Sequence, residues 1–336
     1  MTINVDRGLL LHVRTHDSIG SVLQQMSRAE ELNYERVSMG EATGWNRVGL
    51  LAVAADRTEE LGLTNDVFSP YSRSPALLGQ TAAMLQQLSD GRYRLGLGTS
   101  SPPLVENWHG LSFDRPLRRL REAIEIVRQV TTGERVNYEG EIFELQGFQL
   151  KDPAPEIAPP IDVAAVGPKA VELVGRFADG WVPQMFTPDG LHERLEDLER
   201  GSDLGSRDPE AIRTSFILRC CAMENGEQAR NIARNHLAFV IGAYGPYYRK
   251  SLERQGYSDV TKKLQELWES GQRDRMADAL PDSLLDELAA AGTPSEVKQK
   301  YADFAAIEGV DAVRVGFFDG QPVENQLKTM EVLAEL

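Results

Sequence analysis

The residues best suited to acid–base chemistry lie in loops that follow short apolar runs. Glu41 comes two residues after the run Arg36–Met39, and His109 lies in the loop after the run Tyr93–Leu97. A carboxylate or an imidazole in such a loop can give a proton to a bound substrate or take one from it. Each also has a structural alternative, because a loop carboxylate can be solvated and a histidine can simply hydrogen-bond its neighbours. Glu41 and His109 are therefore the candidate catalytic residues.

A loop of small residues follows the run Tyr93–Leu97. Gly98, Thr99 and Ser100 leave little side-chain bulk around their backbone amides, so a ligand could approach closely. The preceding Gly-x-Gly invites a dinucleotide-binding interpretation, but Ser101 stands where that fingerprint needs its third glycine. The loop is therefore a candidate ligand-binding segment of another kind.

A second candidate binding segment is Gly167-Pro168-Lys169, which follows an apolar run at 161–165 and opens a helical pattern. Free backbone amides at a helix start favour an anion, and Lys169 adds a positive charge. The alternative is structural, since proline is simply a good first residue of a helix. The sequence leaves both interpretations open, and we expect a phosphate group here if the segment binds a ligand.

Composition and charge exclude several classes of protein. The chain has 336 residues and a net charge of −15, and nucleic-acid phosphates would be repelled by such an acidic protein. No apolar run reaches the roughly 18 residues of a membrane span, and the first residues lack a signal peptide's basic and apolar regions. We therefore expect a cytoplasmic protein. The two cysteines are adjacent, and no His, Cys or Asp spacing is typical of a metal site, so no metal is expected.

Apolar runs and helical patterns alternate along the chain and predict an α/β fold. Eight strands separated by helices fit a (β/α)8 TIM barrel, with a doubly wound open sheet as the alternative. The predicted strands are 8–13, 36–39, 61–67, 93–97, 161–165, 179–182, 213–222 and 312–315.

The chain is predicted to be a single barrel domain, residues 1–336, with two insertions. Short β-like runs rich in Gly and Pro at about 131–160 suggest a hairpin. The stretch at about 226–291 follows the seventh strand, is polar and helical, and is too long for one crossover helix. We expect it to form a helical insertion folded over the barrel.

Five segments together resemble the luciferase-like monooxygenase superfamily, and within it the branch that uses the deazaflavin coenzyme F420, including methylenetetrahydromethanopterin reductase-like proteins. The resemblance covers nearly the whole chain and depends on the order and spacing of the segments. These are VFSPYSRSP (67–75), LSDGRYRLGLGTSS (88–101), ENWHGLSFDRPLRRLRE (106–122), AAVGPKAVELVGRFADGW (164–181) and FVIGAYGPYYRKSLERQGY (239–257).

The resemblance implies a TIM barrel, a homodimer and a cofactor ring held at the carboxyl end of the barrel. A non-prolyl cis peptide after the third strand would map to Asp66-Val67, and the family's phosphate site to Gly167-Pro168-Lys169. The cofactor-binding residues implied in this way are Asp66, Val67, Ser69, Gly98, Thr99, Ser100, Gly167, Pro168 and Lys169.

The implied function is hydride transfer between C5 of F420 and a small organic substrate. Ser101 stands where some alcohol-oxidising relatives carry Glu, so we expect reduction by the reduced cofactor rather than alcohol oxidation. Ala42 stands where several relatives have His after the acid. Two alternatives stay open: an FMN-dependent luciferase-like monooxygenase, and a non-catalytic cofactor-binding protein.

Overall fold

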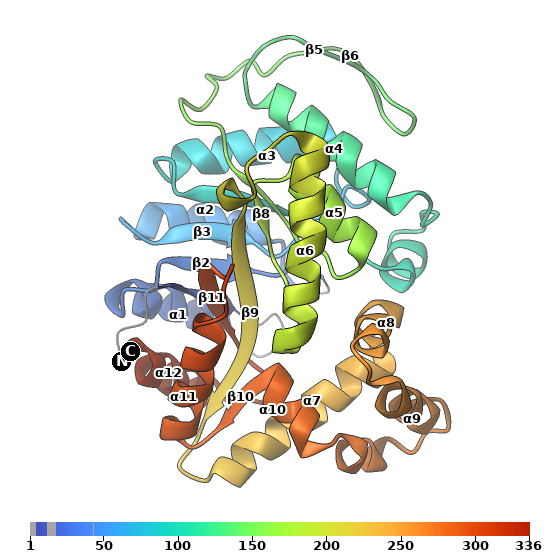
Figure 1. The fold of residues 1–336 in the computed structure, drawn as a ribbon. Coiled ribbons are helices and arrows are strands. Elements are labelled where there is room, and N and C mark those ends of the chain that lie inside the picture. The colour runs from blue at the N-terminus through green and yellow to red at the C-terminus, as the bar shows by residue number, and fades with distance from the viewer. Residues whose placement is uncertain (1–4, 12–17, 43) are drawn as a thin grey trace.

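Eight parallel strands close into a barrel in the computed structural model, which describes residues 5–11, 18–42 and 44–336 (Figure 1). Strand β8 pairs with both β7 and β9, so the sheet has no open edge at this point. The closure confirms the predicted TIM barrel and excludes the doubly wound sheet. The strands are β1 (Asp6–Leu11), β2 (Arg36–Met39), β3 (Gly62–Asn65), β4 (Tyr93–Leu97), β7 (Ile161–Val163), β8 (Gly180–Trp181), β9 (Arg213–Ala222) and β11 (Ala312–Gly316).

Several of the helices that pack around the barrel begin at a capping side chain. Ser18, Ser74 and Thr187 each accept a hydrogen bond from a backbone amide in the first turn, which satisfies one of the unpaired donors at a helix start. These outer helices are α1 (Ile19–Glu31), α2 (Arg47–Arg57), α3 (Pro75–Leu88), α4 (Pro116–Val130), α5 (Pro168–Phe177), α6 (Pro188–Gly205), α11 (Pro294–Ala305) and α12 (Val323–Ala334).

Several predicted bounds differ from the structure. The strand predicted at 61–67 ends at Asn65, because the chain turns at Asp66-Val67. Of the strand predicted at 8–13, His12 and Val13 lie outside the described residues. The segment predicted as helical at 226–291 ends in a short strand, β10 (Ala289–Gly292), which pairs in parallel with β9. Apolar Ala289–Gly292 continues a helical pattern in sequence, and only the neighbouring β9 makes it a strand.

The two predicted insertions have the expected local structure. Strands β5 (Val136–Glu139) and β6 (Glu144–Phe148) form an antiparallel hairpin that packs on α4. Helices α7 (Gly226–Ala243), α8 (Pro246–Arg254), α9 (Ser258–Glu269) and α10 (Asp282–Leu288) form a separate apolar core at one end of the barrel (Figure 1). The single-domain division of the chain stays a prediction. Short helical turns are η1 (Leu104–Trp108), η2 (Pro209–Ala211), η3 (Arg273–Arg275) and η4 (Ala277–Ala279).

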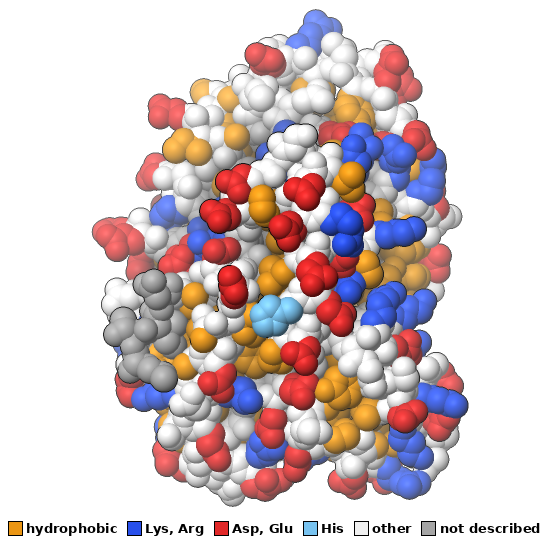
Figure 2. All heavy atoms as spheres, viewed as in Figure 1, with side chains coloured by type: hydrophobic (Ala, Val, Ile, Leu, Met, Phe, Trp, Pro, Cys, Tyr) orange, Lys and Arg blue, Asp and Glu red, His pale blue; other side chains and the backbone are white. Residues whose placement is uncertain are grey.

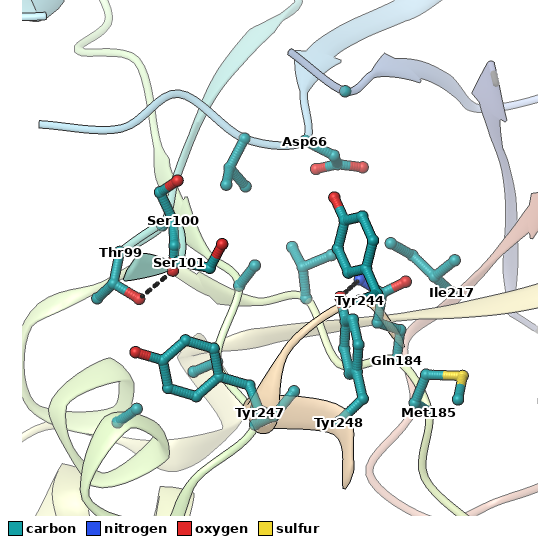
Figure 3. Close-up of a pocket in the computed structure, with 18 of the residues that line it drawn as sticks. Asp66, Thr99, Ser100, Ser101, Gln184, Met185, Ile217, Tyr244, Tyr247 and Tyr248 are labelled. Atoms are coloured by element: carbon teal, nitrogen blue, oxygen red, sulfur yellow. Dashed lines mark hydrogen bonds between the residues drawn. The ribbon is translucent and has the colours of Figure 1, made fainter. Parts of the chain in front are cut away.

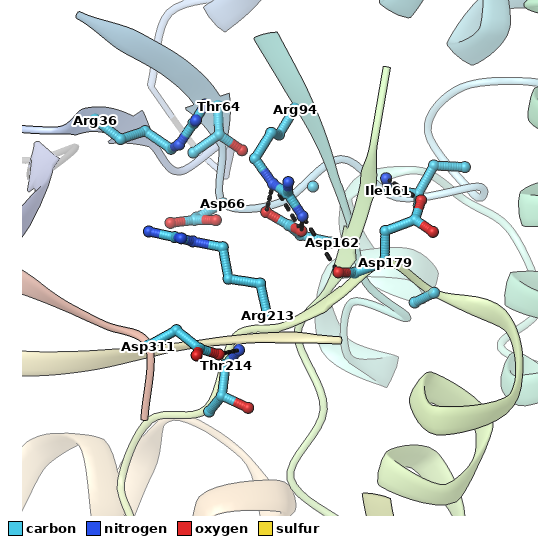
Figure 4. A network of polar contacts seen from close by, with 12 residues as sticks. Arg36, Thr64, Asp66, Arg94, Ile161, Asp162, Asp179, Arg213, Thr214 and Asp311 are labelled. Atoms are coloured by element: carbon cyan, nitrogen blue, oxygen red, sulfur yellow. Dashed lines mark hydrogen bonds and ion pairs between the residues drawn. The ribbon is translucent and has the colours of Figure 1, made fainter. Parts of the chain in front are cut away.

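The barrel interior holds a network of paired charges. Arg94 Nε lies 2.9 Å from Asp162 (Figure 4). Arg314 reaches both Asp66, at 2.8 Å, and Asp162, at 3.4 Å. Buried charges are tolerated only when they are paired, and each of these has an opposite partner. Gly62 leaves space for the Arg36 side chain, since a Cβ on Gly62 would lie 2.8 Å from the Arg36 guanidinium carbon. Leu10, Val182 and Ile217 form a small separate apolar cluster.

The surface is predominantly acidic, and Figure 2 shows Asp and Glu spread over the face that α6 forms, with Lys and Arg gathered on its α4 side. The arginines at the start of α4 and along it largely form ion pairs with Asp and Glu side chains. Arg121 and Glu125 form an i,i+4 pair at 2.7 Å, and Arg118 pairs with Glu141 of the hairpin at 3.0 Å. Glu122 is buried and accepts hydrogen bonds from three backbone amides of the hairpin.

Among the described residues, no helix is long and apolar enough to cross a membrane.

Candidate active site

A cavity of about 810 Å³ opens at the carboxyl ends of the strands. Its size is typical of sites that bind a small molecule or a cofactor ring, and its place is where barrel enzymes carry their chemistry. Loops after β2, β3, β4, β7 and β8 form one part of its wall, and α7 and α8 of the helical insertion form the other. The insertion therefore folds over the barrel, as expected.

The loop after β3 is fixed to β4 at the cavity wall. The peptide bond Asp66-Val67 is cis, as predicted from the resemblance. The side chain of Asn65 holds both backbone groups of Gly96, with distances of 2.6 Å to its carbonyl oxygen and 3.1 Å to its amide nitrogen. A Cβ on Gly98 would lie 2.5 Å from Cγ2 of Val67, so these two residues pack closely because Gly98 has no side chain. Val67 lines the cavity.

Asp66 has a structural partner. Its carboxylate accepts two 2.8 Å hydrogen bonds from Nη1 of Arg314, and its side chain is only 5% exposed. The residue lines the cavity, but the ion pair uses the carboxylate oxygens. Asp66 therefore fixes the loop after β3 through the barrel interior.

The predicted small-residue loop also lines the cavity. Thr99 Oγ1 donates to the carbonyl oxygen of Ser100 at 3.3 Å, as Figure 3 shows. The neighbouring Ser101 hydroxyl is buried, and within the described part of the chain it has no hydrogen-bond partner. A buried hydroxyl without a partner is unfavourable, so a ligand atom is expected to complete its hydrogen bonding.

The start of α5 forms another part of the wall. Gly167 is extended, Pro168 is the first helical residue, and no side chain caps the helix. The cavity here is also lined by Lys169 and, from α8, by Lys250 and Arg254. An uncapped helix start with nearby cations is suited to a phosphate group.

Glu41 lines the cavity and is held in place by an arginine. Its Oε1 lies 2.9 Å from Nη2 of Arg73, and its side chain is 18% exposed. Arg73 itself lies over the Phe68 ring, 4.6 Å from the centroid. This packing keeps the Glu41 carboxylate at the cavity edge.

Two of the predicted site residues lie elsewhere. His109 follows the π-helical turn Leu104–Trp108, which directs the loop outward; it is exposed and is not among the cavity-lining residues. Ser69 accepts a hydrogen bond from the Tyr71 amide at 3.3 Å and stabilises its own turn, also away from the cavity lining. Eight of the predicted cofactor-binding residues line the cavity: Asp66, Val67, Gly98, Thr99, Ser100, Gly167, Pro168 and Lys169.

The sequence did not identify the residues that face the small-residue loop across the cavity. Figure 3 shows Thr99, Ser100 and Ser101 on one side and Gln184, Met185, Ile217, Tyr244 and Tyr248 on the other, with Tyr247 below. The tyrosines come from α8 and the turn before it. They lie in the segment 239–257 that carries the family resemblance, but the resemblance implied no site residue there. Arg219 also lines the cavity. A sequence feature could have identified it, because it is a single cation near the end of the apolar strand β9.

Burial changes the pKa values of the tyrosine side chains on this wall. The Gln184 side-chain amide donates to the Tyr248 hydroxyl, and burial raises the pKa of Tyr248 far above its ordinary value. Burial likewise raises the pKa of Tyr247. Both phenols are therefore neutral at physiological pH and act as hydrogen-bonding groups. In the described ranges, no cluster of three or more His, Cys, Asp or Glu side chains is arranged to hold a metal ion.

Comparison with known proteins agrees with this geometry. The model of the luciferase-like monooxygenase family matches residues 5–311, so the chain belongs to that family, as predicted. It is 30% identical to the 5,10-methylenetetrahydromethanopterin reductase of Archaeoglobus fulgidus over 276 residues, which cover 81% of each chain. It is 31% identical over 303 residues to a Mycobacterium tuberculosis protein described provisionally as a coenzyme F420-dependent oxidoreductase, covering 84% of this chain and 86% of that protein.

The fold has a close match among solved structures. The coenzyme F420-dependent tetrahydromethanopterin reductase from Methanopyrus kandleri superposes with a TM-score of 0.85 at 21% identity, covering 99% of this chain and 98% of that chain. At this identity the match establishes the shared fold, including the path of the helical insertion.

Proposed function

We propose that the protein is a coenzyme F420-dependent oxidoreductase that acts as a reductase on a small organic substrate. The observation that carries this proposal is that one cavity combines the small-residue loop after β4 with the uncapped, lysine-bearing start of α5. The description of the M. tuberculosis relative supports the cofactor, and the name of the A. fulgidus relative supports a reductase. The homodimer and the cytoplasmic location stay predictions.

The residues present fit a flat ring that carries a phosphate-bearing tail. The unpartnered Ser101 hydroxyl and the bare surface of Gly98 suit a ring that lies against the β4 loop. Amides at the start of α5, with Lys169 beside them, suit the phosphate. When bound, the deazaflavin supplies hydride transfer at its C5. The chain's own residues orient the ring, exclude water and handle the accompanying proton.

Of the two candidate proton-transfer residues, we assign the role to Glu41. It lines the cavity and is positioned by Arg73, whereas His109 is exposed outside the lining. A general acid or base must come within hydrogen-bonding reach of the reacting atoms, and of the two residues Glu41 is the one that lines the cavity.

The proposal is tested by titrating the purified protein with oxidised F420 and, separately, with FMN, following absorbance and fluorescence. Saturable binding of F420 in preference to FMN is the expected result. A preference for FMN would assign the protein to the flavin-dependent monooxygenases instead. Binding of neither would favour the non-catalytic alternative.

Lys169→Ala is expected to weaken F420 binding by about tenfold, because the phosphate loses one charge-assisted contact. The dissociation constant from the same fluorescence titration measures the effect, and added salt should shrink the difference. Lys151→Ala is the matched control, since Lys151 is exposed on the hairpin and contacts Gln149. An unchanged dissociation constant in Lys169→Ala would remove the phosphate assignment.

Glu41→Gln is expected to lower turnover by about a hundredfold, in the range typical of a lost general acid or base. The measurement is the absorbance of reduced F420 in the presence of an acceptor found by screening. His109→Gln serves as the control and should keep wild-type turnover. The reverse pattern, with a slow His109 variant and an active Glu41 variant, would exchange the two assignments.

A further inference from the structure

Arg219 is a partly buried cation among the residues that line the cavity. It lies in the carboxyl-terminal half of β9, level with Gly316 of β11. The Arg219 side chain packs beside Gly316, where an added Cβ would be in ordinary contact with Cγ of Arg219 at 3.4 Å. Burial lowers the pKa of Arg219 below its ordinary value, and the guanidinium stays charged at physiological pH.

The hydrogen bonding of Arg219 is incomplete. Its Nη1 donates to the carbonyl oxygen of Phe317, and this is its one hydrogen bond within the described ranges. The guanidinium has several further N–H donors. By contrast, Arg94 and Arg314 inside the barrel each pair with a carboxylate.

Two of the carboxylates that line the cavity are already paired with other arginines. Glu41 pairs with Arg73, and Asp66 pairs with Arg314. Asp319, the carboxylate that most affects Arg219 electrostatically, lies 3.4 Å from Nδ1 of His236. In the part of the chain that the structure describes, no carboxylate oxygen lies within ion-pair distance of Arg219.

The surroundings of Arg219 do not neutralise it. Tyr248 and Tyr244 contribute rings and hydroxyls, and Ile217 and Met185 contribute apolar surface. A charge in such surroundings interacts strongly with an opposite charge and leaves its donors unsatisfied beside a neutral, apolar ligand. The wall is therefore built for a ligand that brings a negatively charged oxygen.

We propose that the substrate carries a carboxylate and that Arg219 binds it, with the rest of the substrate against Tyr244 and Tyr248. The planar guanidinium matches a carboxylate with two parallel hydrogen bonds, and its single charge matches one carboxylate. A phosphate dianion is better served by the start of α5 with Lys169 and Arg254. This inference rests on the proposed function, because it leaves the β4 loop and the start of α5 to the cofactor.

The test compares an acid with its neutral amide as a probe. Cinnamate and cinnamamide are titrated calorimetrically into the wild-type protein, with and without saturating oxidised F420. We expect cinnamate to bind about tenfold more tightly than cinnamamide, the difference typical of a charge-assisted contact. Equal binding of the two, or no binding of cinnamate, would overturn the inference without any variant.

Variants then assign the preference to Arg219. Arg219→Met should reduce the ratio of the affinities for cinnamate and cinnamamide (the acid-to-amide ratio) to within about twofold. Arg219→Lys should keep part of the preference, since lysine retains the charge but not the two parallel N–H donors of the guanidinium. The dissociation constant for F420 should stay within about twofold of wild type in both, because the cofactor contacts are elsewhere. If Arg219→Met keeps the wild-type acid-to-amide ratio, the inference is overturned.

A reciprocal variant separates this inference from the proposed function. Arg254→Met should weaken F420 binding and leave the acid-to-amide ratio unchanged. If the wild-type protein fails to bind F420 but keeps the acid preference in its cofactor-free form, the proposed function fails and the carboxylate site stands. If it binds F420 and shows no acid preference, the carboxylate site fails and the proposed function stands.

Discussion

Gly96→Ala is expected to reduce the free energy of unfolding by about 3 kcal/mol or more, since overpacking that displaces backbone lies at the costly end of core substitutions. A Cβ on Gly96 would lie 1.8 Å from the backbone oxygen of Asn65, so strands β3 and β4 must separate. Separation breaks the two hydrogen bonds between Asn65 and Gly96 that fix the loop after β3. The folded fraction should therefore bind F420 at least about tenfold more weakly, because the ring loses its rigid wall.

Urea denaturation followed by circular dichroism measures the stability, and fluorescence titration measures F420 binding. Gly49→Ala is the matched control: Gly49 is exposed within α2, and nothing lies within 4 Å of its added Cβ. Alanine there should leave stability unchanged or raise it by about 0.5–1 kcal/mol through helix propensity. A wild-type denaturation midpoint for Gly96→Ala would contradict the close packing of β3 on β4.

Asp162→Asn is expected to reduce the free energy of unfolding by about 3–5 kcal/mol, the usual cost of leaving buried partners uncompensated. Asp162 is 1% exposed and accepts hydrogen bonds from Arg94 and Arg314. Without its charge, two arginines remain buried near each other. Asp152→Asn is the control, because Asp152 is exposed and the same substitution there should change stability by less than about 0.5 kcal/mol. Comparable denaturation midpoints for the two variants would show that the charge network adds little to the stability of the fold.

The same aspartate makes stability depend on pH. Burial by itself would raise the pKa of Asp162, but the charge and hydrogen bonds of Arg94 outweigh it, and the pKa in the folded protein is lowered. The unfolded chain then binds the proton more readily, so the contribution is complete above about pH 5 and is lost as the pH falls below about 4. Denaturation midpoints from pH 7 to pH 3 should therefore fall more steeply for wild type than for Asp162→Asn. Parallel curves would contradict this origin of the acid sensitivity.

Local sequence determined the elements and their order. The strands Arg36–Met39, Tyr93–Leu97 and Arg213–Ala222 and the helix Pro75–Leu88 have the predicted bounds. Each depends on residues close in the chain: an apolar run between turn residues, or a capping serine before a proline. The order of short segments was likewise enough to identify the family, and with it the cis bond at Asp66-Val67.

Tertiary structure decided which side chains meet. The partner of Asp66 is Arg314, which comes 248 positions later in the chain and reaches it only because the barrel closes. Gly98 and Lys169 share one cavity for the same reason, whereas His109, in the loop that begins at Gly98, is exposed and outside the cavity lining.

Local patterns assigned no role to the cavity wall opposite the small-residue loop. Arg219 comes from the barrel strand β9 and Tyr248 from the helical insertion, and neither was among the predicted site residues. Hydrophobic periodicity reports which face of an element is buried but not what it is buried against. That depends on where the insertion docks, which is set by packing between segments distant in sequence.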